Sequence, residues 1–257
     1  MDQSPPFVQV INLVRQRDRR DAIQQRMAEL GIDCKILKAV DYKDLSEAEI
    51  AAQGPEFSLR MLRPLSKGEV ACSMSHRQAL YNIAESQYEY GIILEDDAVL
   101  PDDFLTWISD PTLFPEDWDM VKLSGHYIQD RQVWTFGSIR DRRLIYTPKC
   151  TIGTACYLVT REAAGKLAKN LELIDEPVDR FFANQYRNHV VCYEVVPFPV
   201  TVAPVESTIS DREGAQFRKT LKQTLQKKLW RLQQSIGVRL QVLRKVGLIA
   251  AITLTGH

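Results

Sequence analysis

Three consecutive acidic residues, Glu95, Asp96 and Asp97, directly follow the apolar run Ile92-Ile93-Leu94. Such a run predicts a buried strand, and an α/β sheet binds ligands at the carboxyl ends of its strands. Adjacent carboxylates repel one another unless a cation lies between them. Mg²⁺ and Mn²⁺ take oxygen ligands, often one or two carboxylates together with substrate phosphates. This acidic trio therefore predicts a divalent-metal site, with a solvated turn that caps the next helix as the alternative.

Few other side chains have an obvious chemical use. A lone histidine, His76, precedes the trio and is either a ligand or a packing residue; His126 and His189 lack a partner at metal-ligand spacing. A basic cluster after the first predicted strand either receives a phosphate or nucleobase or forms a solvated helix start: Arg15, Arg17, Arg19 and Arg20. The chain contains no GxGxxG, P-loop, GxSxG or HExxH motif, which disfavours dehydrogenases, kinases, serine hydrolases and zinc proteases.

Alternating strand and helix patterns surround these residues. Residues 7–13 predict a strand, 18–30 a helix and 34–40 a second strand. Ser46 with Glu49 and Ser66 with Glu69 form the capping-box pattern that begins a helix, and Thr160 caps a further helix over 161–171. Later strands are expected at residues 120–123, 144–146, 155–159 and 190–196. The order predicts an α/β fold with a mainly parallel sheet.

The composition is that of a globular protein, with 45% apolar and 26% charged residues. Five cysteines without a CxxC pair argue against a disulfide framework or zinc cage and favour a reducing compartment. No signal-peptide pattern begins the chain, and the apolar run at 246–254 is shorter than the roughly 20 residues of a membrane span. We therefore expect a cytoplasmic protein, with a catalytic domain over residues 1–210 and a tail over 211–257.

The tail is basic, because all nine charged residues after position 214 are Lys or Arg. Its apolar residues recur at spacings of three or four and predict an amphipathic helix: Phe217, Leu221, Leu225, Leu229, Leu232, Ile236, Leu240 and Leu243. Five basic residues are expected to point away from this stripe: Lys219, Lys227, Arg231, Arg244 and Lys245. Arg218 and Arg239 fall within it. We expect the tail to bind the anionic inner face of a membrane and not nucleic acid; the alternative is a helix packed on the catalytic domain.

Taken together, these segments make the chain resemble glycosyltransferase family 25, the lipooligosaccharide galactosyltransferase group, in its bacterial branch. Matching blocks occur in family order from about residue 8 to residue 208: Val10-Ile11-Asn12-Leu13 with Asp18-Arg19-Arg20, Leu65-Ser66-Lys67-Gly68-Glu69 with Cys72 and Ser75-His76, Leu94-Glu95-Asp96-Asp97, Gly153-Thr154-Ala155-Cys156-Tyr157-Leu158-Val159, and Pro177-Val178-Asp179. The sequence departs at Ser66, where Thr is common, and at Cys156, where Gly or Ala is common. The collagen-modifying branch is disfavoured, because its larger members add signal and retention sequences.

The resemblance implies a GT-A-like, Rossmann-type fold that uses Mn²⁺ or Mg²⁺ and a UDP-sugar donor, usually UDP-galactose. Transfer would proceed with inversion to a lipid-linked saccharide of lipooligosaccharide or lipopolysaccharide. Glu95 and Asp97 would bind the metal, with Asp97 the foremost direct ligand, and the remaining nucleotide-sugar contacts would come from Asn12, Arg19, Lys67, His76, Asp96 and Thr154.

An inverting transfer also needs a base for the acceptor hydroxyl, and Asp179 after Pro177 is the candidate. Glu206 and the trio itself are rivals, and Asp179 could instead cap a helix over 180–186. Two other functions stay open: a non-catalytic, membrane-docked scaffold with this fold, and a metal-dependent phosphoryl transferase, although the chain has no phosphate-cradling glycine loop.

Overall fold

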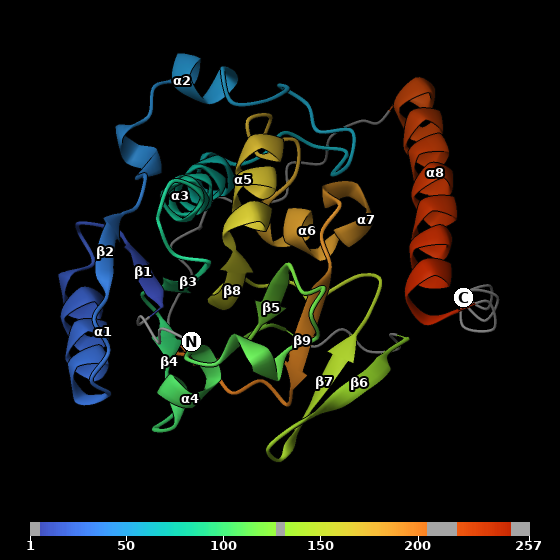
Figure 1. Cartoon of the computed structure of the whole chain (residues 1–257). Coiled ribbons are helices and arrows are strands. Elements are labelled where there is room, and N and C mark those ends of the chain that lie inside the picture. Colours follow the sequence, from blue (N-terminus) through green and yellow to red (C-terminus); the bar gives the residue numbers. More distant parts are fainter. Residues whose placement is uncertain (1–5, 127–131, 205–219, 248–257) are drawn as a thin grey trace.

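The computed structural model describes residues 6–126, 132–204 and 220–247 and is built around an eight-stranded sheet (Figure 1). In spatial order the strands are β2 (Lys35–Lys38), β1 (Phe7–Asn12), β3 (Tyr90–Glu95), β8 (Cys156–Thr160), β5 (Met120–Lys122), β9 (Cys192–Val196), β7 (Arg142–Tyr146) and β6 (Trp134–Ile139). A second, two-stranded sheet pairs β4 (Ala98–Val99) with β10 (Thr201–Val202).

The large sheet is mixed, which corrects the expectation of a mainly parallel one. Three pairings are parallel, β1 with β2 and β3, and β5 with β9. Four are antiparallel, because β8 is inserted antiparallel between β3 and β5, and the β6–β7 hairpin adds an antiparallel edge beside β9. The α/β class is confirmed, while the order of strand directions depends on the long-range insertion of β8.

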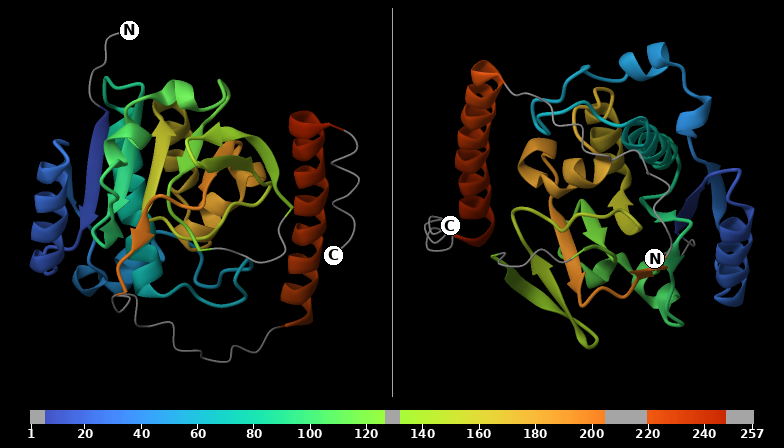
Figure 2. Two further views of the ribbon diagram at one scale, coloured as in Figure 1. Left: turned by 90° about the horizontal axis from the view of Figure 1, so that it is seen from below. Right: turned by 180° about the vertical axis from the view of Figure 1, so that it is seen from behind.

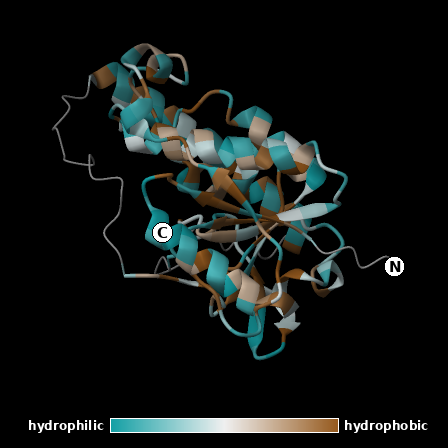
Figure 3. Ribbon diagram, turned by 90° about the vertical axis from the view of Figure 1, so that its left-hand side faces the viewer, coloured by the Kyte–Doolittle hydropathy of each residue, from teal (hydrophilic) through white to brown (hydrophobic). Residues whose placement is uncertain are grey.

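Helices cover both faces of the sheet, so its central strands are buried (Figures 2 and 3). On one face α3 (Lys67–Ala84), α5 (Arg161–Asn170) and α6 (Val178–Ala183) pack on side chains such as Ile93. On the other, α1 (Arg17–Glu29) and α4 (Phe104–Ile108) pack on side chains such as Ile92 and Leu94. Successive side chains of a strand point to opposite faces, so β3 needs apolar residues at every position. The remaining helical elements are η1 (Tyr42–Asp44), α2 (Glu47–Ala51), η2 (Pro111–Leu113), α7 (Gln185–Asn188) and α8 (Leu221–Val246).

The predicted helix starts are confirmed. Both Ser46 and Ser66 accept a hydrogen bond from the backbone N–H three residues on, and Glu49 and Glu69 return the reciprocal bond. Thr160 accepts from the N–H of Ala163 at the start of α5. The start of α3 matters most, because this helix carries His76 toward the end of β3.

Two expectations about elements were wrong or incomplete. The single helix over 180–186 is divided at Asn184, whose side chain accepts from the N–H of Arg187 and so begins α7 separately. Strand β6 was missed because its register shifts between Thr135 and Gly137 and most of its residues are exposed.

The C-terminal helix α8 lies at the side of the molecule opposite α1 (Figures 1 and 2). This helix spans Leu221–Val246, which confirms the helix predicted for the tail. The expected domain boundary near residue 210, together with Glu206, Phe217, Arg218 and Lys219, lies outside the described residues. Within the described part of the chain, no helix has the combined length and apolar character that a membrane span requires.

Candidate active site

The acidic trio lies where β3 ends and the chain turns into β4. Glu95 is the last residue of β3, and its backbone N–H donates to the carbonyl of Ala155 at 3.0 Å. The carbonyl of Asp97 accepts from the N–H of Ala203 at 2.9 Å. The backbone on both sides of Asp96 is thus held by chain segments that come from elsewhere in the sequence.

Glu95 is held by a chain of polar contacts. The Thr154 hydroxyl donates to Glu95 Oε1, and His76 Nε2 lies 3.3 Å from the same oxygen. His76 Nδ1 lies 2.9 Å from the Tyr157 hydroxyl. A carboxylate only accepts, so the network assigns the proton to Nε2 and lets Tyr157 donate to Nδ1. Burial opposes ionisation of Glu95, but the hydrogen bonds from His76 and Thr154 and the positive charge of Lys122 outweigh it and lower the pKa of this carboxyl.

Asp96 faces the opposite direction, toward β1 and α1. Its Oδ2 accepts from Asn12 Nδ2 at 2.6 Å, and its Oδ1 lies 3.4 Å from Arg19 Nη1. Burial nevertheless raises the pKa of Asp96, because it outweighs the hydrogen bond from Asn12 and the charge of Arg19. Asn12 and Arg19, both predicted to contact the nucleotide, are therefore tied directly to the trio.

Asp97 is the member of the trio with unused coordinating capacity. Its Oδ1 is buried and has no hydrogen-bond partner among the described residues. Burial, followed by repulsion from Glu95 and Asp96, raises its pKa from 3.8 to about 6. A cation beside this oxygen would offset both the burial of the charge and the repulsion. The Asp97 carboxylate is therefore the group in the trio best suited to bind a metal.

The described residues contain no cluster of three or more His, Cys, Asp or Glu side chains able to hold a metal by themselves. This agrees with the way Mg²⁺ binds at phosphate-transfer sites, where one or two carboxylates are completed by water and substrate phosphates. Glu95 uses Oε1 for Thr154 and His76, which leaves Oε2 as its second oxygen. The donor set therefore fits a cation shared with a diphosphate and does not form an all-protein cage.

Three hollows border the trio, and two of them have Glu95 in their walls. The first, here the β1–α3 pocket, lies between β1 and α3 and has apolar and polar walls; its polar lining residues include Arg15, Arg19, Tyr42, His76, Glu95 and Asp96. The second, here the Asp97 pocket, is partly open to solvent and lies between the trio and the first turn of α6. Its lining includes Arg19, Glu95, Asp97, His126, Thr154 and Asp179. Since Arg19 and Glu95 line both, the trio forms their shared wall.

Asp179 lies across the Asp97 pocket, in the first turn of α6. Its Oδ1 accepts from the backbone N–H of Arg180 at 2.7 Å. Pro177 is the N-cap of this helix, so the alternative that Asp179 serves as the N-cap is wrong. The structure thus brings the candidate base and Asp97 to one cavity although 82 positions separate them in the chain.

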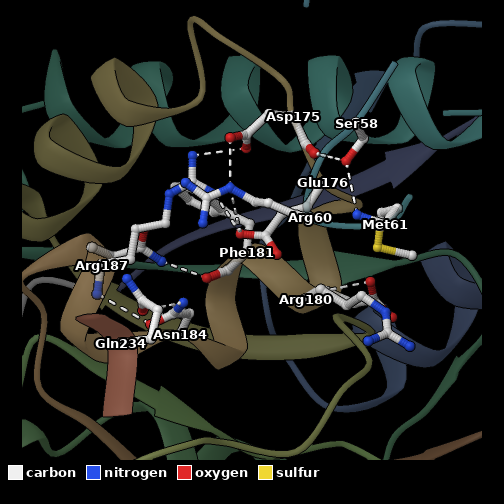
Figure 4. A network of polar contacts seen from close by, with 12 residues as sticks. Ser58, Arg60, Met61, Asp175, Glu176, Arg180, Phe181, Asn184, Arg187 and Gln234 are labelled. Atoms are coloured by element: carbon white, nitrogen blue, oxygen red, sulfur yellow. Dashed lines mark hydrogen bonds and ion pairs between the residues drawn. The ribbon is translucent and has the colours of Figure 1, made fainter. Parts of the chain in front are cut away.

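The segment before Asp179 is anchored by an ion-pair network (Figure 4). Asp175 Oδ2 lies 2.6 Å from Arg60 Nε, and Asp175 Oδ1 lies 2.8 Å from Arg187 Nη2. Arg187 also pairs with the buried Glu176. Burial raises the pKa of Glu176 despite the two neighbouring guanidinium groups. These contacts anchor the chain directly before Pro177 and Asp179.

One predicted site residue lies apart from the others. Lys67 is at the start of α3, where its ammonium pairs with Glu47, and it lines neither pocket. The other predicted residues, Asn12, Arg19, His76 and Thr154, surround the trio through the contacts described above.

Two supporting residues escaped the sequence analysis. Tyr157 orients His76, and the buried Lys122 donates to the carbonyls of Thr151 and, at 2.7 Å, Gly153. Lys122 thereby holds the loop that carries Thr154. The sequence did contain a signal for Lys122, because a lysine inside a predicted buried strand needs hydrogen-bond partners when it is desolvated. Tyr157 offered no such signal, since a tyrosine is an ordinary strand residue.

Comparisons with known proteins place these residues in a family. A family model described as "Glycosyltransferase family 25 (LPS biosynthesis protein)" matches residues 6–182. Procollagen galactosyltransferase 1-B of Xenopus laevis is 30% identical over 198 residues, which cover 71% of this chain and 31% of that protein. Procollagen galactosyltransferase 1 of Danio rerio is 28% identical over 210 residues, which cover 74% of this chain and 33% of the relative.

The chain thus spans about a third of the length of the curated relatives that it matches. Among solved structures, one titled "Crystal Structure of A197 from STIV" aligns with a TM-score of 0.39 at 15% identity, over 77% of this chain and 83% of that one. The matched family segment, residues 6–182, contains the trio, both pockets' principal polar residues and Asp179.

Proposed function

Because this chain belongs to glycosyltransferase family 25, we propose that it is a metal-dependent glycosyltransferase with a GT-A-like fold. It transfers a hexose with inversion, and UDP-galactose is the proposed donor, in keeping with relatives that are named galactosyltransferases. The observation that carries the proposal is the place of the acidic trio at the shared wall of the β1–α3 pocket and the Asp97 pocket.

The β1–α3 pocket is the proposed nucleotide site. Its walls combine apolar side chains with Tyr42 and with two guanidinium groups, Arg15 and Arg19. Guanidinium groups bind phosphate oxygens well, since their planar N–H groups match the spacing of the oxygens. Arg19 also lines the Asp97 pocket, so a diphosphate beside it would extend from the nucleotide site toward Asp97.

Asp97, with Glu95 as the second carboxylate, is proposed to hold Mn²⁺ or Mg²⁺. When bound, the metal supplies an electrophile that stabilises the negative charge developing on the departing diphosphate. Arg19 adds a fixed positive charge at the same place. His76 and Thr154 hold Glu95 by hydrogen bonds, which keeps this carboxylate ionised and oriented.

Asp179 is proposed to take the proton of the acceptor hydroxyl as it attacks the anomeric carbon. Asp179 lines the Asp97 pocket, where the donor hexose and the acceptor hydroxyl are proposed to meet. The network around Asp175 and Glu176 would hold the base at a constant distance from the donor.

The acceptor is proposed to be a lipid-linked saccharide of lipooligosaccharide or lipopolysaccharide, in line with the description of the matching family. The place of action would be the cytoplasmic face of the membrane that carries this lipid.

Turnover of a panel of UDP-sugars in the absence of acceptor tests the proposal. Mn²⁺-dependent release of UDP and free hexose is expected, with UDP-galactose the preferred donor. Asp97→Asn should lose this activity, and Asp33→Asn, which changes an exposed acid just before β2, should retain it.

Two outcomes would contradict the proposal. If UDP binds but no UDP-sugar is turned over with or without a saccharide acceptor, the chain is a non-catalytic scaffold. If the products are UMP and a sugar phosphate, the diphosphate bond has been cleaved and the chain is a phosphoryl transferase.

A further inference from the structure

Helix α8 is attached to the rest of the protein by an inner face that combines polar, aromatic and apolar residues. The Arg60 guanidinium lies over the Trp230 ring at 4.7 Å, and Gln234 Oε1 accepts from Asn184 Nδ2 at 2.9 Å. Gly237 lies against Tyr186 so closely that a Cβ there would be 1.9 Å from the ring. These contacts fix the rotation of α8 about its own axis.

The last anchor of this inner face is Lys245. Its ammonium pairs with Asp117 and lies 4.9 Å from the centre of the Tyr193 ring and 5.3 Å from that of Phe136. A cation against aromatic faces is favourable when it is desolvated. Lys245 thus points away from the apolar stripe, as expected, but its ammonium is bound within the protein and is not available to a lipid surface.

Six apolar residues of α8 lie on the opposite, outer side. Their spacings of three and four put them on one stripe, and each exposes half or more of its surface: Leu221, Leu225, Leu229, Leu232, Ile236 and Leu240, at 91%, 59%, 55%, 59%, 52% and 50%. The helix thus packs on the body through a mixed inner face, which also buries Val242, and leaves this stripe outward. From Leu225 to Leu240 this outer stripe is about 22 Å long at 1.5 Å per residue.

Basic residues border the outer stripe on both sides, and Arg239 lies within it. Five are exposed on α8: Lys222, Lys228, Arg231, Arg239 and Arg244. Residues 215–257 contain no acid, so nothing in this segment neutralises them. The surface is complementary to a partner that is apolar and anionic along its whole length.

We propose that the outer face of α8 binds an anionic lipid bilayer, with the outer stripe in the acyl boundary and the basic borders at the headgroups. This arrangement is that of an interfacial amphipathic helix, which lies in the plane of the membrane. The inner-face contacts then hold the body of the protein at a constant orientation to the lipid. No α8 residue lines either pocket at the acidic trio, so lipid binding does not depend on the transfer reaction.

A second copy of α8 is a poorer occupant of the same face. Arg239 follows Leu225 and Leu232 at intervals of seven and would be buried in a seam between two helices. The bordering charges are all basic, so two copies would place like charges opposite each other. At a bilayer, by contrast, the long Arg239 side chain can reach the headgroups while its stem stays in the apolar layer.

Vesicle sedimentation of the full chain tests the proposal. Wild type should bind vesicles of phosphatidylcholine with phosphatidylglycerol, bind pure phosphatidylcholine weakly, and be released by high salt. Leu229→Gln with Leu232→Gln and Ile236→Gln should abolish binding. Lys228→Gln with Arg239→Gln should weaken it about 25-fold, since each basic residue near an anionic surface contributes about fivefold.

Matched control variants distinguish binding through α8 from nonspecific binding of the protein to vesicles. Leu105→Gln with Leu113→Gln changes apolar residues that are exposed elsewhere, and Lys35→Gln with Lys38→Gln removes two exposed charges in β2. Both controls should bind vesicles like wild type. Because the substituted α8 residues are exposed, their variants should keep the wild-type melting temperature.

Three results would overturn the proposal. The first is equal sedimentation of wild type and the triple Gln variant, and the second is binding that ignores phosphatidylglycerol and salt. The third is a wild-type dimer, measured by light scattering, that the triple variant converts to monomers while neither protein sediments with vesicles; this would identify a second copy as the occupant.

Discussion

Replacing Asp97 with Asn should stabilise the metal-free protein and at the same time abolish transfer. Asp97 has a buried oxygen without a hydrogen-bond partner and stands beside two other carboxylates. Ionised, it is desolvated and repelled; as Asn it carries no charge. The change therefore removes the proposed metal ligand and relieves an unfavourable charge in one step.

The magnitude follows from the pKa. Burial and the neighbouring acids raise the pKa of Asp97 in the folded state from 3.8 to about 6. The folded state thus binds more protons than the unfolded state in this window, so stability falls as the pH rises from about 4 through 6. The full difference corresponds to about 3 kcal/mol, and partial solvent access to Asp97 reduces it to about 1–2 kcal/mol. For a chain of this size that is about 2–8 °C in melting temperature above about pH 7.

Thermal unfolding after dialysis against a chelator measures this effect. At about pH 8 Asp97→Asn should melt above wild type, and the two curves should converge near pH 4. Adding Mn²⁺ at about 100 times its dissociation constant should stabilise wild type by about 2.7 kcal/mol and leave the variant unchanged. Asp33→Asn, which removes an exposed acid, serves as the control and should follow wild type throughout.

The reasoning fails if Asp97→Asn is no more stable than wild type at about pH 8, because the carboxylate would then be solvated or already paired. It fails equally if Mn²⁺ raises the melting temperature of both proteins by the same amount, since the cation would then bind elsewhere. Either result leaves the family membership intact and removes Asp97 from the metal site.

Three further substitutions test other parts of the site and of α8. Lys122→Met should lower the free energy of unfolding by about 2–4 kcal/mol in urea titrations, because it leaves the carbonyls of Thr151 and Gly153 without their buried donor; a loss under 1 kcal/mol would mean that the loop finds other donors. Asp179→Asn should lower kcat by about 10²–10⁴-fold without changing UDP affinity in calorimetric titrations, and an unchanged kcat would pass the base role to another group. Gly237→Ala should expose α8 to limited proteolysis because its Cβ would meet the Tyr186 ring, whereas Gly137→Ala, where a Cβ meets nothing within 4 Å, should not; equal cleavage of both would show that α8 is not held at this contact.

Local patterns in the sequence were sufficient for the elements that carry the site. The apolar run before the trio predicted β3, and the serine–glutamate pairs predicted the starts of α2 and α3. Each of these features depends on residues within one turn or one strand, where the local backbone geometry determines which side chains are neighbours. The alternation of strand and helix likewise indicated the α/β class.

The hydrogen-bond partners and the pKa shift of each acid in the trio could only come from the tertiary structure. Thr154 and Tyr157 stand 59 and 81 positions from the residues they contact, Glu95 and His76, so no local spacing relates them. The same is true of strand direction, since β8 returns antiparallel between β3 and β5.

The C-terminal helix shows the same division. Periodicity predicted its stripe of apolar residues, and composition predicted its charge, because both are properties of one segment. Neither could say which side faces the protein, and the fold places the stripe outward because Trp230, Gly237 and Lys245 find their partners on Arg60, Tyr186 and Asp117. The sequence alone determined that α8 has two faces, and packing against distant residues decided which of them meets solvent.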